Sequence, residues 1–143
     1  MSELVIERRF SADAETVFAY VTQTGHLLEW WGPEGMAVTE HDLDLSRPGP
    51  WVSTIVNAEG GTHKVSGVVI AVDPPRSVEF TWGWHDAEDK RGHDSCVRFE
   101  VRPGEGGGSH FRLVHTGLAD DESAEGHSRG WTSTLKKLER LAV

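Results

Sequence analysis

Residues 120–141 read DDESAEGHSRGWTSTLKKLERL, and the apolar side chains in this stretch recur every three or four positions. The stripe consists of Ala124, His127, Trp131, Leu135, Leu138 and Leu141. This spacing predicts one amphipathic helix of about twenty residues. Acidic residues at its start and basic residues near its end suit the two poles of the helix dipole. The rest of the chain must therefore supply an apolar surface long enough to cover the stripe.

The N-terminal part of the chain predicts a strand followed by two short helices. Leu4, Ile6 and Phe10 alternate with other residues at the period of a strand. Helices are expected over residues 14–21 and 26–31, because a capping Asp precedes the first and a Gly-Pro pair ends the second.

The middle of the chain, residues 36–116, predicts six more strands separated by Gly- and Pro-rich turns. The turns are too short for crossover helices, so the strands should pair antiparallel as a meander. The expected fold is α+β and of the helix-grip type. A curved antiparallel sheet of about seven strands wraps around the long C-terminal helix, and two short helices follow the first strand. Residues 1–143 are expected to form a single domain.

The composition of the chain limits the classes of binding partner that we expect. The net charge is −9, from 14 basic and 23 acidic side chains, and no window gathers Lys and Arg into a phosphate-binding patch. We therefore expect no nucleic acid partner. No apolar run reaches the ~20 residues of a spanning helix, so we expect no membrane insertion and a cytoplasmic location. Cys96 is the only cysteine, and its place in an alternating strand indicates a structural role.

Short motifs in a fixed order resemble a known family. They are ELVIER (3–8), WWGP (30–33), GVV (67–69), DPPR (73–76), FTW (80–82), HTGL (115–118), EGH (125–127) and GW (130–131). Together they resemble the bacterial single-domain homologues of the heat-shock protein 90 ATPase activator. Those proteins belong to the START-like, birch-pollen-allergen and polyketide-cyclase superfamily. The resemblance covers residues 4–141 and implies the same helix-grip fold.

Strand parity gives the candidate site. The strand over residues 78–84 alternates so that its Phe and Trp side chains face the cavity, while Glu79 and Thr81 face away. The chain has 6 Trp, and indoles suit the wall of an apolar pocket. The predicted ligand-binding cavity comprises Trp31, Phe80, Trp82, Trp84, Phe99, Leu113, His115, His127 and Trp131.

Two histidines have two interpretations each. His115 is either a core residue with hydrogen-bonded nitrogens or an acid or base that acts on a ligand. His127 either packs between the helix and the sheet or lines the ligand-binding cavity. Gly126 and Gly130 lie inside the predicted helix at a cost of roughly 1 kcal/mol each, which close backbone approach or space for a ligand would explain.

No metal site and no cofactor are expected. The histidines and carboxylates of residues 85–94 fit a solvated hairpin better than a structural metal site. Motifs for nucleophilic catalysis, phosphate binding and dinucleotide binding are missing. An enzyme is therefore the less favoured class, and no catalytic residue is assigned unless His115 or His127 moves a proton.

Three functions stay open at this point. The first is a domain that binds a hydrophobic or aromatic metabolite or lipid. The second is a chaperone-linked stress-response module, although the eukaryotic activator uses an additional N-terminal domain that these residues do not supply. The third is a cyclase-like or hydrolase-like enzyme with a cavity histidine. A homodimer through a strand edge or the open end of the fold is a further alternative.

Overall fold

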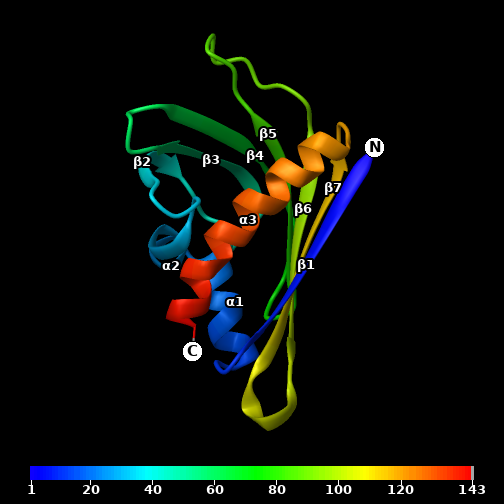
Figure 1. The fold of residues 1–143 in the computed structure, drawn as a ribbon. Coiled ribbons are helices and arrows are strands. Elements are labelled where there is room, and N and C mark those ends of the chain that lie inside the picture. The colour runs from blue at the N-terminus through cyan, green and yellow to red at the C-terminus, as the bar shows by residue number, and fades with distance from the viewer. Residues whose placement is uncertain (143) are drawn as a thin grey trace.

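A seven-stranded antiparallel sheet forms the frame of the computed structural model, which describes residues 1–142 (Figure 1). The strands are β1 (Ser2–Phe10), β2 (Ala37–Asp42), β3 (Gly49–Val56), β4 (Thr62–Asp73), β5 (Ser77–Trp84), β6 (Ser95–Pro103) and β7 (Ser109–Leu118). Their order in the sheet is β1-β7-β6-β5-β4-β3-β2. Strands β2 to β7 thus form the predicted meander, and β1 pairs with β7 at one edge.

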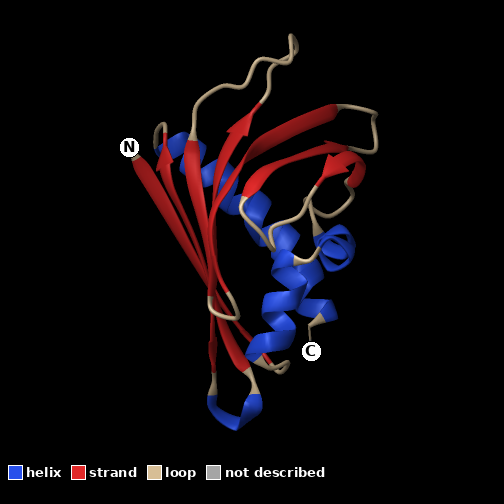
Figure 2. Cartoon of the chain, turned by 180° about the vertical axis from the view of Figure 1, so that it is seen from behind, coloured by secondary structure: helices blue, strands red, loops and turns tan. Residues whose placement is uncertain are grey.

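Three α-helices complete the fold: α1 (Ala14–Thr22), α2 (Thr24–Trp30) and α3 (Asp121–Leu141). A 3-10 turn, η1 (Glu105–Gly107), links β6 to β7. Figures 1 and 2 show α3 crossing one face of the sheet, with α1 and α2 at its C-terminal half. The predicted helix-grip fold is confirmed.

Capping side chains set the helix starts. The Asp13 carboxylate accepts a hydrogen bond from the Thr16 N–H at 2.8 Å, and the Asp120 carboxylate accepts one from the Ser123 N–H at 2.8 Å. The second helix differs from its predicted range, because it begins at Thr24 and Trp31 is already extended. The Trp31 N–H still bonds to the Leu27 carbonyl, so this residue caps the helix and turns its indole toward the sheet.

The core lies between α3 and the inner face of the sheet. Phe80, Phe99 and Phe111 pack on adjacent strands, with the first two rings 5.2 Å apart and edge to face. Leu135 and Leu138 of α3 are fully buried against this layer. The outer face carries charged side chains, and Arg98 pairs there with Glu79. Within residues 1–142, no helix is long and apolar enough to cross a membrane.

Candidate ligand-binding pocket

A pocket of about 360 Å³ lies between α3 and the half of the sheet formed by β3, β4 and β5. Its sheet wall consists of Ile55, His63, Val65, Trp82 and Trp84. The inward parity of these strands explains the set, because Ile55 follows Trp51 and Ser53 on one side of β3, and all three are buried. Trp84, at the end of β5, is 36% exposed and therefore stands at the mouth.

The helix wall comes from three successive turns of α3. Its members are Ser123, Gly126, His127, Gly130, Trp131 and Thr134. A Cβ atom added to Gly130 would meet nothing within 4 Å, and one added to Gly126 would meet only the end of the Arg129 side chain at 3.9 Å. Close backbone approach therefore does not explain these glycines, and both lie beside open space on the pocket side of the helix.

The third wall is the loop that follows α2, with Trp31, Gly32, Pro33 and Met36. The Trp31 indole N–H donates to the Ser53 hydroxyl at 2.9 Å, which fixes the ring against β3. Glu34 holds the loop to α3, because its N–H donates to the Ser133 hydroxyl at 3.0 Å and its carboxylate accepts from Arg140 at 2.5 Å.

Four indoles line the pocket, and Trp82 lies among the other three. Its ring centroid is 5.0 Å from that of Trp131, 5.5 Å from that of Trp84 and 6.0 Å from that of Trp31. Among the described residues, none of the lining side chains carries a carboxylate, ammonium or guanidinium group. An aromatic, uncharged guest therefore matches this wall better than an ion.

His115 lies beneath the pocket rather than on its surface and is fully buried. The Ser95 hydroxyl donates to the Trp82 carbonyl at 3.1 Å, so its oxygen accepts from His115 Nε2–H at 2.8 Å. The Trp131 indole N–H donates to His115 Nδ1 at 3.1 Å. This network assigns the neutral imidazole with its proton on Nε2. Burial, and then the nearby His127, lower the pKa of His115 to about 3.

His127 faces the pocket and joins its two main walls. Its Nε2 accepts from the Trp84 indole N–H at 3.0 Å, and its Nδ1–H donates to the Ser123 carbonyl at 2.8 Å. Both nitrogens of the neutral ring are thus engaged. The bond to Trp84 ties the end of β5 to α3 at the mouth.

The structure brings five of the nine predicted cavity residues to the pocket wall: Trp31, Trp82, Trp84, His127 and Trp131. The other four lie in the packed core beneath it: Phe80, Phe99, Leu113 and His115. Parity assigned all four to the inner face, but it carries no information on depth. At strands β3–β5 the sheet curves away from α3 and leaves the pocket open. Buried side chains fill the space between α3 and strands β6 and β7.

Several lining residues were not among the predicted cavity residues. Ile55 and Val65 share the inward parity of their strands, which is a signal that could have found them. Pro33 and Met36 lie in a loop without periodicity, and only the three-dimensional path of that loop brings them to the pocket.

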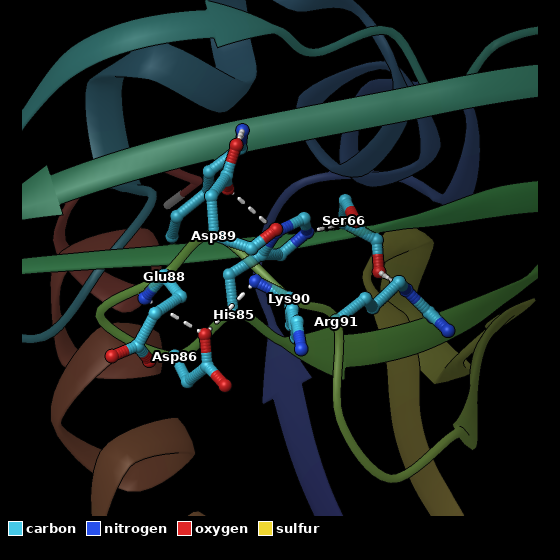
Figure 3. Close-up of polar contacts among 8 residues, drawn as sticks. Ser66, His85, Asp86, Glu88, Asp89, Lys90 and Arg91 are labelled. Atoms are coloured by element: carbon cyan, nitrogen blue, oxygen red, sulfur yellow. Dashed lines mark hydrogen bonds and ion pairs between the residues drawn. The ribbon is translucent and has the colours of Figure 1, made fainter.

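The connection over residues 85–94 is held by polar contacts within itself and with Ser66 of β4 (Figure 3). The Asp86 carboxylate accepts from the N–H groups of Glu88 and Lys90, both at 2.9 Å. His85 bonds to the Ser66 hydroxyl at 2.7 Å and to the Asp89 carboxylate at 2.9 Å. Within the described part of the chain, no group of three or more His, Cys, Asp or Glu side chains could hold a metal ion.

Two other features lie on the outer face, away from the pocket. A larger open hollow of about 1030 Å³ is lined by charged side chains, and Glu100 there pairs with Arg98 and Arg112. Its lining carries six arginines against three carboxylates: Arg8, Arg9, Arg76, Arg98, Arg102 and Arg112 against Glu7, Asp73 and Glu100. Burial, and then the carboxylate of Glu79, raise the pKa of the Cys96 thiol to about 11, so it stays protonated near neutral pH.

Solved structures of other proteins share this fold. The AHSA1 protein from Silicibacter pomeroyi is 49% identical, with a TM-score of 0.94 over 97% of this chain and 96% of that one. Protein CV1439 from Chromobacterium violaceum is 25% identical, with a TM-score of 0.82 over 98% and 96% of the two chains. A Mycobacterium smegmatis protein, Ms6760, is 22% identical and shares the fold, with a TM-score of 0.82 over 99% of this chain and 90% of that one.

No curated protein matches the sequence. The family model described as "Activator of Hsp90 ATPase homolog 1-like protein" matches residues 11–142. This match and the 49% identical structure confirm the resemblance read from the motifs. The chain belongs to the family of activator of Hsp90 ATPase homolog 1-like proteins, which have the START-like helix-grip fold.

Proposed function

We propose that this protein binds an uncharged, largely apolar small molecule in the pocket between α3 and strands β3–β5. The observation that carries the proposal is an open pocket above two helical glycines. Gly126 and Gly130 each destabilise the helix by roughly 1 kcal/mol relative to Ala. In return, neither residue places a side chain in the open space of the pocket. A volume of about 360 Å³ lies within the usual range of small-molecule sites.

The enzyme alternative has less support. A proton-transfer residue must reach the substrate, and His115 does not line the pocket. Both nitrogens of His127 already have protein partners. A chaperone-linked role rests on the family name alone, which is an analogy rather than a site. The cytoplasmic location and the single-domain organisation are parts of the proposal that rest on the sequence.

The test is to fill the pocket from the helix side. Gly130→Leu places a side chain into the open space, whereas Arg129→Leu places the same side chain at the neighbouring exposed position of α3. The probe is N-phenyl-1-naphthylamine, an uncharged fluorophore. We expect saturable binding to the wild type and to Arg129→Leu, and an affinity at least about tenfold lower for Gly130→Leu.

Thermal unfolding of all three proteins would check that each of them is folded. Equal affinity in Gly130→Leu and the wild type would contradict the proposal, since the probe would then bind elsewhere. Native mass spectrometry of the protein purified from its own host, followed by analysis of any released compound, would identify the natural guest.

A further inference from the structure

The six indole N–H groups of the chain differ in whether a protein group accepts their hydrogen bond. Five of them donate to a protein acceptor: those of Trp30, Trp31, Trp51, Trp84 and Trp131. The sixth, of Trp82, is buried and has no hydrogen-bond partner among residues 1–142. Trp82 is 7% exposed and forms part of the sheet wall of the pocket.

A buried N–H without an acceptor costs about 1–3 kcal/mol, and native proteins seldom leave one so. The indoles of Trp31 and Trp131 show how this fold avoids the cost, because Ser53 and His115 are placed to accept from them. No such side chain faces the Trp82 nitrogen within the described chain. Its position on the pocket wall indicates where the missing acceptor comes from.

We propose that the guest of this pocket is an uncharged aromatic molecule of one or two rings that carries a carbonyl-type oxygen, and that this oxygen accepts the hydrogen bond of Trp82 Nε1–H. The inference rests on the proposed function and specifies its ligand class. The indole-lined wall selects the aromatic part, and the lack of lining charges selects a neutral molecule.

Neighbouring protein atoms cover the Trp82 nitrogen, so the acceptor reaches it only when a neighbouring side chain shifts. Trp84 is the ring able to yield, because it is 36% exposed and stands at the mouth, 5.5 Å from the Trp82 ring. Within the described chain, one side-chain hydrogen bond holds the Trp84 ring, from its indole N–H to His127. Entry of the guest therefore shifts Trp84 and brings the oxygen to Trp82.

The experiment compares two guests of the same shape. 2-Acetylnaphthalene carries a carbonyl oxygen, and 2-isopropenylnaphthalene replaces that oxygen with a methylene group. In the ¹⁵N-labelled wild-type protein, we expect the ketone to move the assigned Trp82 indole N–H resonance downfield and to slow its exchange with water. The alkene should do neither.

Affinities give a second readout. The ratio of ketone to alkene affinity should fall about three- to tenfold in Trp82→Phe, the effect of one lost hydrogen bond. It should stay unchanged in Trp51→Phe, whose N–H already bonds to the Thr81 carbonyl and whose side chain lies outside the pocket lining. If Trp82→Phe fails to fold, the resonances of the wild type decide.

The outcomes separate the two proposals. Binding of both guests with the same small effect on the Trp82 resonance would overturn the hydrogen bond while the pocket function stands. Absence of binding by both guests and by N-phenyl-1-naphthylamine would overturn the pocket function, and this inference with it.

Discussion

The neutral imidazole of His115 is the residue that best illustrates how burial decides chemistry in this fold. Its Nδ1 accepts from the indole of Trp131 and its Nε2–H donates to Ser95, so a second proton would face a donor. The pKa of His115 is lowered to about 3 by burial, and then by His127. Between its ordinary pKa of 6.5 and about 3, the unfolded chain binds a proton at this position that the folded chain does not.

The stability contributed by neutral His115 is therefore complete above pH 6.5 and lost as the pH falls below it, by up to about 1.4 kcal/mol per pH unit. We expect His115→Asn to be less stable than the wild type at pH 7.5, because it loses part of the network. Its free energy of unfolding should fall less steeply between pH 6.5 and 5. Urea unfolding at these pH values measures both effects.

His110→Asn is the control, because this histidine is half-buried on the outer face of β7. This variant removes one imidazole and leaves the network of Ser95, His115 and Trp131 in place. A pH dependence of His115→Asn equal to that of the wild type would show that another group accounts for the slope.

At the scale of the element, α3 must pack tightly against the sheet along one part of its length and leave space for the pocket along another. Leu135 and Leu138 pack against the sheet, while the turns with Gly126 and Gly130 stand over open space. Ala at either glycine should raise the free energy of unfolding by about 0.5–1 kcal/mol, because it favours the helix and meets no close atom. The melting temperature should rise by about 2–5 °C per substitution.

Gly67→Ala is the contrasting variant. In β4 a Cβ atom at this position would lie 1.9 Å from the Thr81 carbonyl oxygen, so the substitution should destabilise the protein. Differential scanning calorimetry of the three variants measures these shifts. A lower melting temperature for both α3 variants would show that these glycines serve the backbone rather than the pocket.

The same helix shows how far the sequence carries the prediction. The apolar period predicted the length of α3 and the face that holds Trp131, and strand parity predicted that Trp82 points inward. Neither pattern distinguishes the packed end of the fold from the open end. That distinction depends on how far β3 and β4 curve away from the helix, and on the loop through Met36, whose path no periodicity encodes.

At the scale of the whole molecule, contacts between distant segments close the pocket. Glu34, in the loop after α2, bonds through its N–H to Ser133 and through its carboxylate to Arg140, while Lys137 donates to the Trp31 carbonyl at 3.3 Å. The hydrogen bond from Arg140 holds the pKa of Glu34 below its ordinary value of 4.5. The ion pair is thus complete above pH 4.5 and lost as the pH falls further.

Because Glu34 and Arg140 are exposed, their pair adds little to global stability. Its effect should instead be on the motion of the loop that lines the pocket. We expect Arg140→Ala to leave the melting temperature nearly unchanged and to speed release of N-phenyl-1-naphthylamine several-fold, as measured by stopped-flow fluorescence. High salt should bring the wild-type rate toward that of the variant, because salt screens exposed charges.

Arg129→Ala controls for the loss of one positive charge, since this residue is exposed on α3 and does not line the pocket. It should release the probe at the wild-type rate. If Arg140→Ala also keeps the wild-type rate, the loop does not limit release, and the guest leaves past Trp84 and His127 by the same shift of Trp84 that admits it, since their hydrogen bond is the other tie across the mouth. A faster release in Trp84→Phe would then identify that route, because this change removes the tie and leaves the loop contacts of Glu34 in place.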